Sequence, residues 1–296
     1  MTLGAWRFLQ DSRPDRVDVE VFNPEVDNEG WYAPVTVRRA SISERPFIVD
    51  SLREFLHEQG LSIECLIYPV MQIERNGAGD IVSVRSCSNS ECNEAFVHCE
   101  GSRIVDAGAQ ESLRSEVSRH LQDVIRVTDD LHSMIDAVNG TVVMPAESIG
   151  LLPDISEELE EVQAFLRWLL DGAFVFLGYR EYDIVELDAG SAIVVRPGSG
   201  IGVLRNEAES SFAEPVLVGE TNLETRDLVT GGPHLIITKT NDRSTVHRLA
   251  RMDYIGVKKL SGDGKVAGEH RFIGLFTSKA FGEDANKIPI LRHRSR

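Results

Sequence analysis

The sequence has few cysteines and no long apolar run. Four cysteines among 296 residues are too few for a small secreted scaffold built on disulfides. No stretch approaches the roughly 18 apolar residues of a membrane-spanning helix, and the first residues lack the basic start and apolar core of a signal peptide. These absences predict a cytoplasmic protein with free thiols and no contact with a membrane.

Basic residues are also scarce. The chain has 31 lysines and arginines against 47 aspartates and glutamates, which gives a formal net charge of −16. Nucleic-acid-binding proteins carry a basic field over a whole face, so this balance excludes that class. The 42% apolar and 26% charged residues are typical of a globular protein, and at about 150 residues per domain the length predicts two domains.

The sequence also lacks a zinc knuckle. Cys87, Cys92, His98 and Cys99 are residue types that bind zinc, but no pair has the Cys-x-x-Cys spacing. His98 and Cys99 are adjacent and would point to opposite faces of a strand. We therefore expect no metal site and no disulfide.

Apolar periodicity predicts two modules. In the first, Pro46 fits the first position of a helix that Gly60 ends, and Asn76-Gly77 is a hairpin signal. In the second, Asp154 and Glu157 form a capping box, and Asp263-Gly264 marks another hairpin. The expected helices are 46–59, about 113–138 and 154–170, and the expected strands are 17–22, from 35, 61–75, from 81, 95–97, 173–185, 191–197, 200–205, 234–240, 244–260 and 269–281.

These elements predict an α+β fold in which helices cover one face of antiparallel sheets. Within it, residues 239–271 hold eight basic and four acidic residues, a local charge of +4 in an acidic chain. Such a segment suits a carboxylate, a phosphate or an acidic protein surface, although a solvated sheet face with cross-strand ion pairs is the simpler interpretation. The candidate interface or anion-binding residues are Arg243, His247, Arg248, Arg251, Lys258 and Lys259.

No catalytic constellation is convincing. Ser244, His247 and Asp253 have the residue types of a hydrolase triad, but their spacing on one strand prevents them from converging. The glycine-rich stretch 198–202 is not followed by a helix, so a strand connection is a better interpretation than a phosphate loop. The residues alone therefore predict a two-module protein without a catalytic site.

Several long motifs add a family resemblance. RPFIVDSL (45–52), FVFLGYREYD (174–183), ITKTNDRSTVHRLARMDYIGVKK (237–259) and GEHRFIGLFTSKAF (268–281) occur in this order, and IPILR (288–292) follows. Together they closely resemble the amino-terminal region of the large bacterial NAD-dependent glutamate dehydrogenases. The resemblance implies a fragment that contains a leading segment (1–29), an ACT-like, ferredoxin-like domain (30–145), a PAS-like domain (150–285) and a tail (286–296).

What the resemblance implies for function is regulation and assembly. The parent enzymes oxidise L-glutamate to 2-oxoglutarate and ammonia with NAD, but the residues that bind NAD and perform catalysis lie outside this fragment. The expected partners are the rest of the polypeptide, other subunits of a homo-oligomer and an amino-acid effector. Arg45, Asp50 and Ser51 are the candidate effector site, because the first turn of a helix offers free backbone N–H groups to a carboxylate. Helix capping and packing remain an equal alternative there, and a self-contained amino-acid or small-anion sensor is the alternative function.

Overall fold

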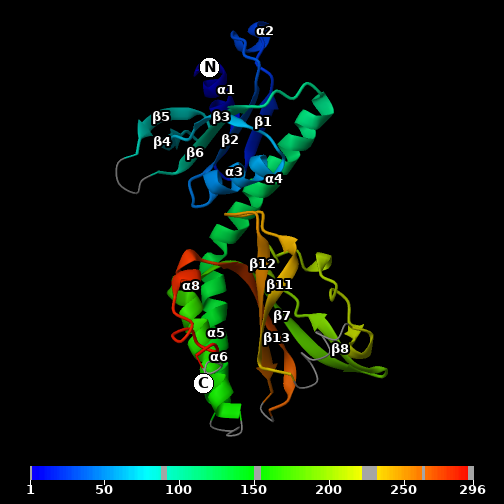
Figure 1. The fold of residues 1–296 in the computed structure, drawn as a ribbon. Helices are drawn as coiled ribbons and strands as arrows, with labels where there is room; N and C mark the ends of the chain where they lie inside the picture. Colours follow the sequence, from blue (N-terminus) through cyan, green and yellow to red (C-terminus); the bar gives the residue numbers. More distant parts are fainter. Residues whose placement is uncertain (1, 88–91, 150–154, 222–231, 262–263, 293–296) are drawn as a thin grey trace. The chain divides into compact units, whose positions relative to one another are not determined.

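The fold is that of a computed structural model, which describes residues 2–87, 92–149, 155–221, 232–261 and 264–292 (Figure 1). It consists of two compact units. Unit 1 contains Met1–Ile125 together with Thr245–Leu249, and unit 2 contains Arg126–Ser244 and Ala250–Arg296. The short segment Thr245–Leu249 therefore belongs with unit 1, although the residues on both sides of it belong to unit 2.

Unit 1 is built on an antiparallel sheet. Its strand order is β1-β2-β6-β4-β5, and β3 also pairs with β6. The strands are β1 Asp18–Phe22, β2 Thr36–Ser43, β3 Ile63–Ile67, β4 Val70–Arg75, β5 Ile81–Ser86 and β6 Glu94–Gly101. Because β1 pairs with β2 over five residues, the segment that the sequence analysis treats as a leader forms part of this sheet.

Helices complete unit 1. They are α1 Thr2–Asp11, α2 Val26–Glu29, α3 Ile48–Glu58 and the greater part of α4 Ala107–Asp129. Apolar residues of α3 such as Leu52 and Leu56 are buried, as are Val37 and Ile42 of β2. Fully burying each such side chain contributes about 1.5–3 kcal/mol, so the apolar stripe read from the sequence is what fixes α3 in the core.

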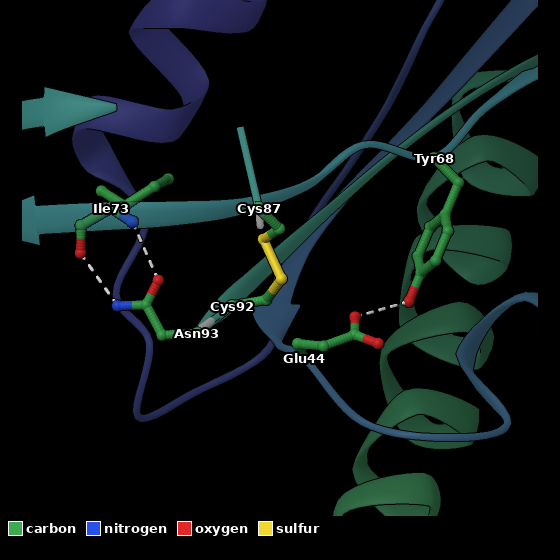
Figure 2. The surroundings of a disulfide bond; sticks show 6 residues. All are labelled: Glu44, Tyr68, Ile73, Cys87, Cys92 and Asn93. Carbon is green, nitrogen blue, oxygen red and sulfur yellow. Dashed lines mark hydrogen bonds between the residues drawn. A yellow bond between two sulfur atoms is a disulfide. The ribbon is translucent and has the colours of Figure 1, made fainter. Parts of the chain in front are cut away.

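The β5–β6 connection corrects the expectation of free thiols. Cys87 and Cys92 form a disulfide (Figure 2). Cys65 and Cys99 are free. Next to the disulfide, the Asn93 side chain accepts a hydrogen bond from the backbone N–H of Ile73 at 2.8 Å and donates one to the Ile73 carbonyl at 2.9 Å. Asn93 thus holds the start of β6 against β4, and the disulfide joins the two ends of the β5–β6 connection.

Unit 2 is built on a second antiparallel sheet. Its strand order is β10-β8-β7-β13-β12-β11, and β9 also pairs with β7. The strands are β7 Phe174–Leu187, β8 Gly190–Val195, β9 Ile201–Gly202, β10 Val216–Leu217, β11 Leu235–Arg243, β12 Arg251–Leu260 and β13 Val266–Phe276. Figure 1 shows α5 (Leu131–Ile149), α6 (Ser156–Trp168) and α8 (Ser278–Gly282) together on one side of this sheet. The predicted α+β class, with antiparallel sheets and helices on one face, is confirmed.

Several predicted boundaries are wrong. The strand expected at 61–75 is divided at Pro69, because β3 and β4 pair with opposite ends of β6. The helix expected to end near Asn139 continues through Gly140 to Ile149 and is interrupted at Asp130 instead. The carboxylate of Asp130 accepts hydrogen bonds from the backbone N–H of Gly202 at 2.7 Å and from Arg205 at 2.6 Å.

The strand expected at 244–260 begins only at Arg251, and the one expected at 269–281 ends at Phe276, where α8 follows. The capping box at Asp154 and part of the Asp263-Gly264 hairpin lie outside the described residues.

Candidate functional site

The site begins at the first turn of α3, where the sequence predicts an effector position. The residue before the helix is Phe47, whose backbone is left-handed with φ 74°. Pro46 therefore precedes the N-cap and is not the first helical residue, which corrects that prediction. A left-handed conformation costs an L-residue about 1–2 kcal/mol, so Phe47 is held in place by its surroundings.

A distant part of the chain covers this turn. The backbone N–H of His247 donates to Oγ of Ser51 at 2.9 Å, and the rings of His247 and Phe47 lie 5.1 Å apart. Nδ1 of His247 is 3.6 Å from Oδ2 of Asp50. Ser51 and Asp50, which the sequence predicts as ligand residues, thus already contact Thr245–Leu249. Since the segment also contains the left-handed His247, φ 69°, the strand predicted through Val246 and Arg248 is wrong.

The same segment is bound to α4. Oγ1 of Thr245 donates to Oδ2 of Asp123 at 2.8 Å, and Nδ1 of His120 donates to the Thr245 carbonyl at 3.1 Å. Val246, which lies between Thr245 and His247 in sequence, is fully buried. Thr245–Leu249 is therefore anchored to α3 and α4 by polar and apolar contacts, and we call it the return segment.

His120 is an interior residue of this site. Its ring lies 4.3 Å from that of Phe55 on α3, and burial is the main cause that lowers its pKa below the ordinary value of histidine. The neutral ring, with its proton on Nδ1, is the form that donates to Thr245. The sequence analysis missed His120, Asp123 and Thr245, because no local pattern shows which segment contacts α4.

Arg45 has a different role from the one predicted. Its Nε donates to the Ser43 carbonyl at 3.3 Å and its Nη1 donates to the Ile125 carbonyl at 3.4 Å, while Nη2 contacts Oγ of Ser43. These contacts join the end of β2 to α4. The structure therefore brings Asp50 and Ser51 together with His247, whereas these bonds of Arg45 go to Ser43 and to the Ile125 carbonyl.

The other basic candidates lie in unit 2 or beside the return segment. Lys258 and Lys259 are buried; Lys258 donates to the Gly232 carbonyl at 2.6 Å. Lys259 pairs with Glu181 at 3.0 Å and with Asp183 at 2.6 Å. Burial alone would raise the pKa of Asp183, but hydrogen bonds from Lys259 and Arg196 outweigh it and hold that pKa below its ordinary value. Arg243 and Arg251 are exposed at the end of the β11–β12 pair, and Arg248 belongs to the return segment.

The sequence analysis also missed a buried charge cluster on β7, β12 and β13. Arg271 pairs with the fully buried Glu269 at 3.0 Å and donates to the Tyr182 hydroxyl at 2.9 Å. Its guanidinium carbon lies 3.9 Å from the Tyr182 ring centre and 5.0 Å from that of Tyr254, whose hydroxyl donates to Glu269. Alternation along β13 places Glu269 and Arg271 on the same face, which is the only signal the sequence offers.

The alternative chemistries find no support in the described residues. Among them, no group of histidine, cysteine, aspartate and glutamate side chains could hold a metal ion. The N–H groups of Gly198 and Gly200 donate to the Glu207 carboxylate at 3.1 and 2.8 Å, so this glycine-rich loop binds a carboxylate of its own chain. Asp253 pairs with Lys239 at 2.6 Å. None of the described helices is long and apolar enough to cross a membrane.

Comparison with known proteins gives a consistent result. Residues 1–117 match the family described as "Glutamate dehydrogenase, ACT1 domain". The chain is 30% identical over 308 aligned residues to an NAD-specific glutamate dehydrogenase of Pseudomonas aeruginosa, with 98% of this chain covered. It is 26% identical over 303 residues to the protein of that name from Halomonas elongata, with 99% covered, and 28% identical over 255 residues to the one from Mycobacterium tuberculosis, with 84% covered. The chain spans about 18% of the length of the first two.

Proposed function

Because residues 1–117 belong to the glutamate dehydrogenase ACT1 domain family and nearly the whole chain is related to NAD-specific glutamate dehydrogenases, we propose that it is a regulatory and assembly segment of such an enzyme. The parent reaction would convert L-glutamate, NAD and water to 2-oxoglutarate, ammonia and NADH in the cytoplasm. NAD and the catalytic groups would be held by other parts of the polypeptide. Unit 2 would supply the PAS-like domain, and the partners would be the remaining polypeptide and further subunits.

The return segment is the observation that carries this proposal. A regulatory domain has to transmit its state to the rest of its chain, and an effector can do so only by binding two states with different affinity. Here the turn proposed to bind an effector is in contact with a segment almost 200 residues away in sequence, since His247 donates to Ser51. An amino-acid carboxylate or amino group that binds Ser51 and Asp50 would compete with these contacts and release the segment.

Calorimetric titration of the chain with a panel of amino acids, followed by amide hydrogen exchange, tests the proposal. A binding amino acid should speed exchange of the His247 amide by about tenfold, because it takes over the hydroxyl that this amide uses. Asp50→Asn should weaken binding, since it removes the carboxylate proposed to meet an α-amino group.

Asp136→Asn is the matched control, because Asp136 on α5 has a similarly exposed side chain, 64% against 60% for Asp50. No heat with any amino acid at millimolar concentration would sink the effector part of the proposal. Glutamate-dependent reduction of NAD by the isolated chain would sink the non-catalytic part.

A self-contained amino-acid or small-anion sensor is the second candidate. The same turn of α3 favours it, because effector binding there does not require a catalytic domain. The natural length of the protein separates the two functions. A polypeptide of about 296 residues supports the sensor, and one several times longer that contains a dinucleotide-binding region supports the enzyme segment.

A further inference from the structure

Strand β11 is an edge strand that runs beside an apolar groove. In the described part of unit 2 its one strand partner is β12. An edge strand presents a row of backbone N–H and C=O groups that an extended peptide can pair with. We propose that the free edge of β11 and this groove bind an extended segment, apolar at one end and acidic at the other, from polypeptide outside these residues. This rests on the proposed function, because it requires a longer chain.

The groove has the size and lining of a binding site. It encloses about 560 Å³ and is walled by aromatic and aliphatic side chains. It is lined by Trp168 of α6 and Phe276 of β13, whose rings lie 6.1 Å apart, by Ile237 of β11 and by residues of the carboxyl-terminal part of unit 2. Volumes of about 300–1,000 Å³ are typical of sites that bury a ligand or an anchoring side chain.

Large apolar side chains at the rim of the groove remain in contact with solvent. Phe281 is 72% exposed, Ile237 is 43% exposed and Leu291 is 42% exposed. At about 25 cal/mol per Å², covering aromatic and branched side chains of this size stabilises a complex. Their clustering along one groove therefore favours a partner with apolar side chains at this end of β11.

At the other end of β11, charged side chains indicate which kind of partner residue can bind. A second hollow, polar in character, is lined by Thr238, Lys239, Asn241, Arg251 and Asp253, and it shares Ile237 with the groove. The exposed charged side chains around it are the basic Lys239, Arg243 and Arg251 and the acidic Asp242, and Lys239 is paired with the buried Asp253 at 2.6 Å. In a chain of net charge −16, this local excess of exposed cations fits carboxylates of the partner.

The order of the two hollows selects an extended occupant. They follow one another along β11, the apolar one beside Leu235–Ile237 and the polar one beside 237–241. A strand paired with β11 would advance about 3.3 Å per residue and pass both in turn, whereas a helix in the groove would leave the edge of the strand unpaired. The inference also gives Arg243 and Arg251, interface candidates in the sequence, a definite acidic partner.

Hydrogen exchange of the β11 amides in the full-length enzyme and in residues 1–296 tests this docking. In the full-length enzyme the outward-facing amides of β11 should exchange at least about tenfold more slowly, because they gain a partner. The double variant Ile237→Lys, Phe281→Ser should remove this protection. Val82→Lys is the matched control, because Val82 is 66% exposed on β5, an edge strand of the other sheet. In this variant the β11 amides of the full-length enzyme should stay as protected as in the wild type.

Two results would overturn the inference. One is equal exchange of β11 in the full-length enzyme and in residues 1–296. The other is a concentration-dependent dimer of residues 1–296, measured by light scattering, that Ile237→Lys abolishes, since it would make a second copy the occupant. Both differ from failure of the proposed function, which would appear as a natural polypeptide that ends at Arg296 and has no catalytic region.

Discussion

The rings of Phe47 and His247 lie 5.1 Å apart, and both residues have left-handed backbones, with φ 74° and 69°. They are the N-cap residue of α3 and the middle residue of the return segment. Left-handed residues other than glycine are uncommon and concentrate at functional sites, where surrounding contacts hold them. Here the contacts are mutual, so each of the two strained residues helps to hold the other.

The strain at His247 predicts a difference between two substitutions. His247→Val should lower the free energy of unfolding by about 1–2 kcal/mol more than His247→Asn, because asparagine tolerates the left-handed region and a β-branched residue does not. Both variants lose the ring contact with Phe47 and keep the backbone N–H, so the difference isolates the backbone. Urea denaturation measures it, and equal stability of the two variants would contradict the strain.

The hydroxyl of Ser51 should contribute to stability through the hydrogen bond that it accepts from the backbone N–H of His247. Ser51→Ala leaves the His247 N–H without its acceptor and should cost about 1–3 kcal/mol, the penalty for a buried unsatisfied donor. Ser191→Ala removes a hydroxyl whose hydrogen bond to Glu186 is exposed, and it should change stability by less than about 0.5 kcal/mol. A Ser51→Ala variant as stable as the Ser191 control would show that the bond is unimportant.

Removing one partner of the buried ion pair in unit 2 should lower the free energy of unfolding more than removing both. Arg271→Met leaves the fully buried Glu269 without its cation and should cost about 3–5 kcal/mol. Adding Glu269→Leu should recover part of that loss, because no buried charge then remains. Denaturant unfolding of the single and double variants gives the comparison.

Arg114→Met provides the control for an exposed pair. Arg114 and Glu111 form an exposed ion pair on α4, which should contribute little to stability. An Arg271→Met variant that unfolds with the stability of this control would contradict the cluster.

Stability should fall in acid through His270. Burial is the main cause that lowers the pKa of His270 to about 4, and its surroundings include Glu181, Asp183, Lys259 and Arg196. An unfolded histidine binds a proton near pH 6.5, so below that pH the unfolded state binds more protons than the folded state. The stability that the buried neutral His270 contributes is therefore fully present above about pH 6.5 and is lost progressively as the pH falls towards 4.

The measurement is the free energy of unfolding between pH 7.5 and about 4. His270→Asn should reduce the proton uptake on unfolding in this window by about one. His132→Asn is the control, because the His132 side chain is 88% exposed. Equal pH profiles for the wild type and the His270 variant would contradict the assignment.

Thiol counting checks the disulfide. The denatured chain should react with two equivalents of maleimide before reduction, at Cys65 and Cys99, and with four after it. Cys87→Ser should react with three without reduction, since it frees Cys92. Four reactive thiols in the unreduced wild type would restore the expectation made from the sequence.

Short sequence patterns correctly predicted the elements that depend on the burial of one face or on the chemistry of a turn. The apolar stripe through Leu52 and Leu56 gave α3, and the alternation along β13 gave its strand, because burial of one face decides both. Turn chemistry at Asn76-Gly77 gave the β4–β5 hairpin. The family motifs added the resemblance to an ACT-like domain, expected at 30–145, which periodicity cannot provide; the matching ACT1 family model covers residues 1–117.

What the sequence could not provide depends on contacts between distant residues. Val246 and Arg248 alternate with their neighbours as in a strand, but Val246 is buried by contacts within unit 1 that no short window contains. Asp130, where the helix is interrupted, bonds to Gly202 and Arg205, and Met134 and Val138 of the continuing helix are buried; these contacts too are with residues outside any short window. The disulfide between Cys87 and Cys92 was not predicted, because two cysteines five residues apart do not form a recognisable disulfide pattern in the sequence.

The return segment also means that unit 1 is not a continuous stretch of sequence. A fragment that ends at Ile125 would lack the contacts that Ser51, Asp123 and His120 make with Thr245–Leu249. Such a fragment would expose the surface that Thr245–Leu249 covers in the intact chain. A synthetic peptide containing these five residues should bind there. Complementation in trans would then turn an intramolecular contact into a binding equilibrium whose affinity for the peptide, and whose competition with amino acids, could be titrated directly.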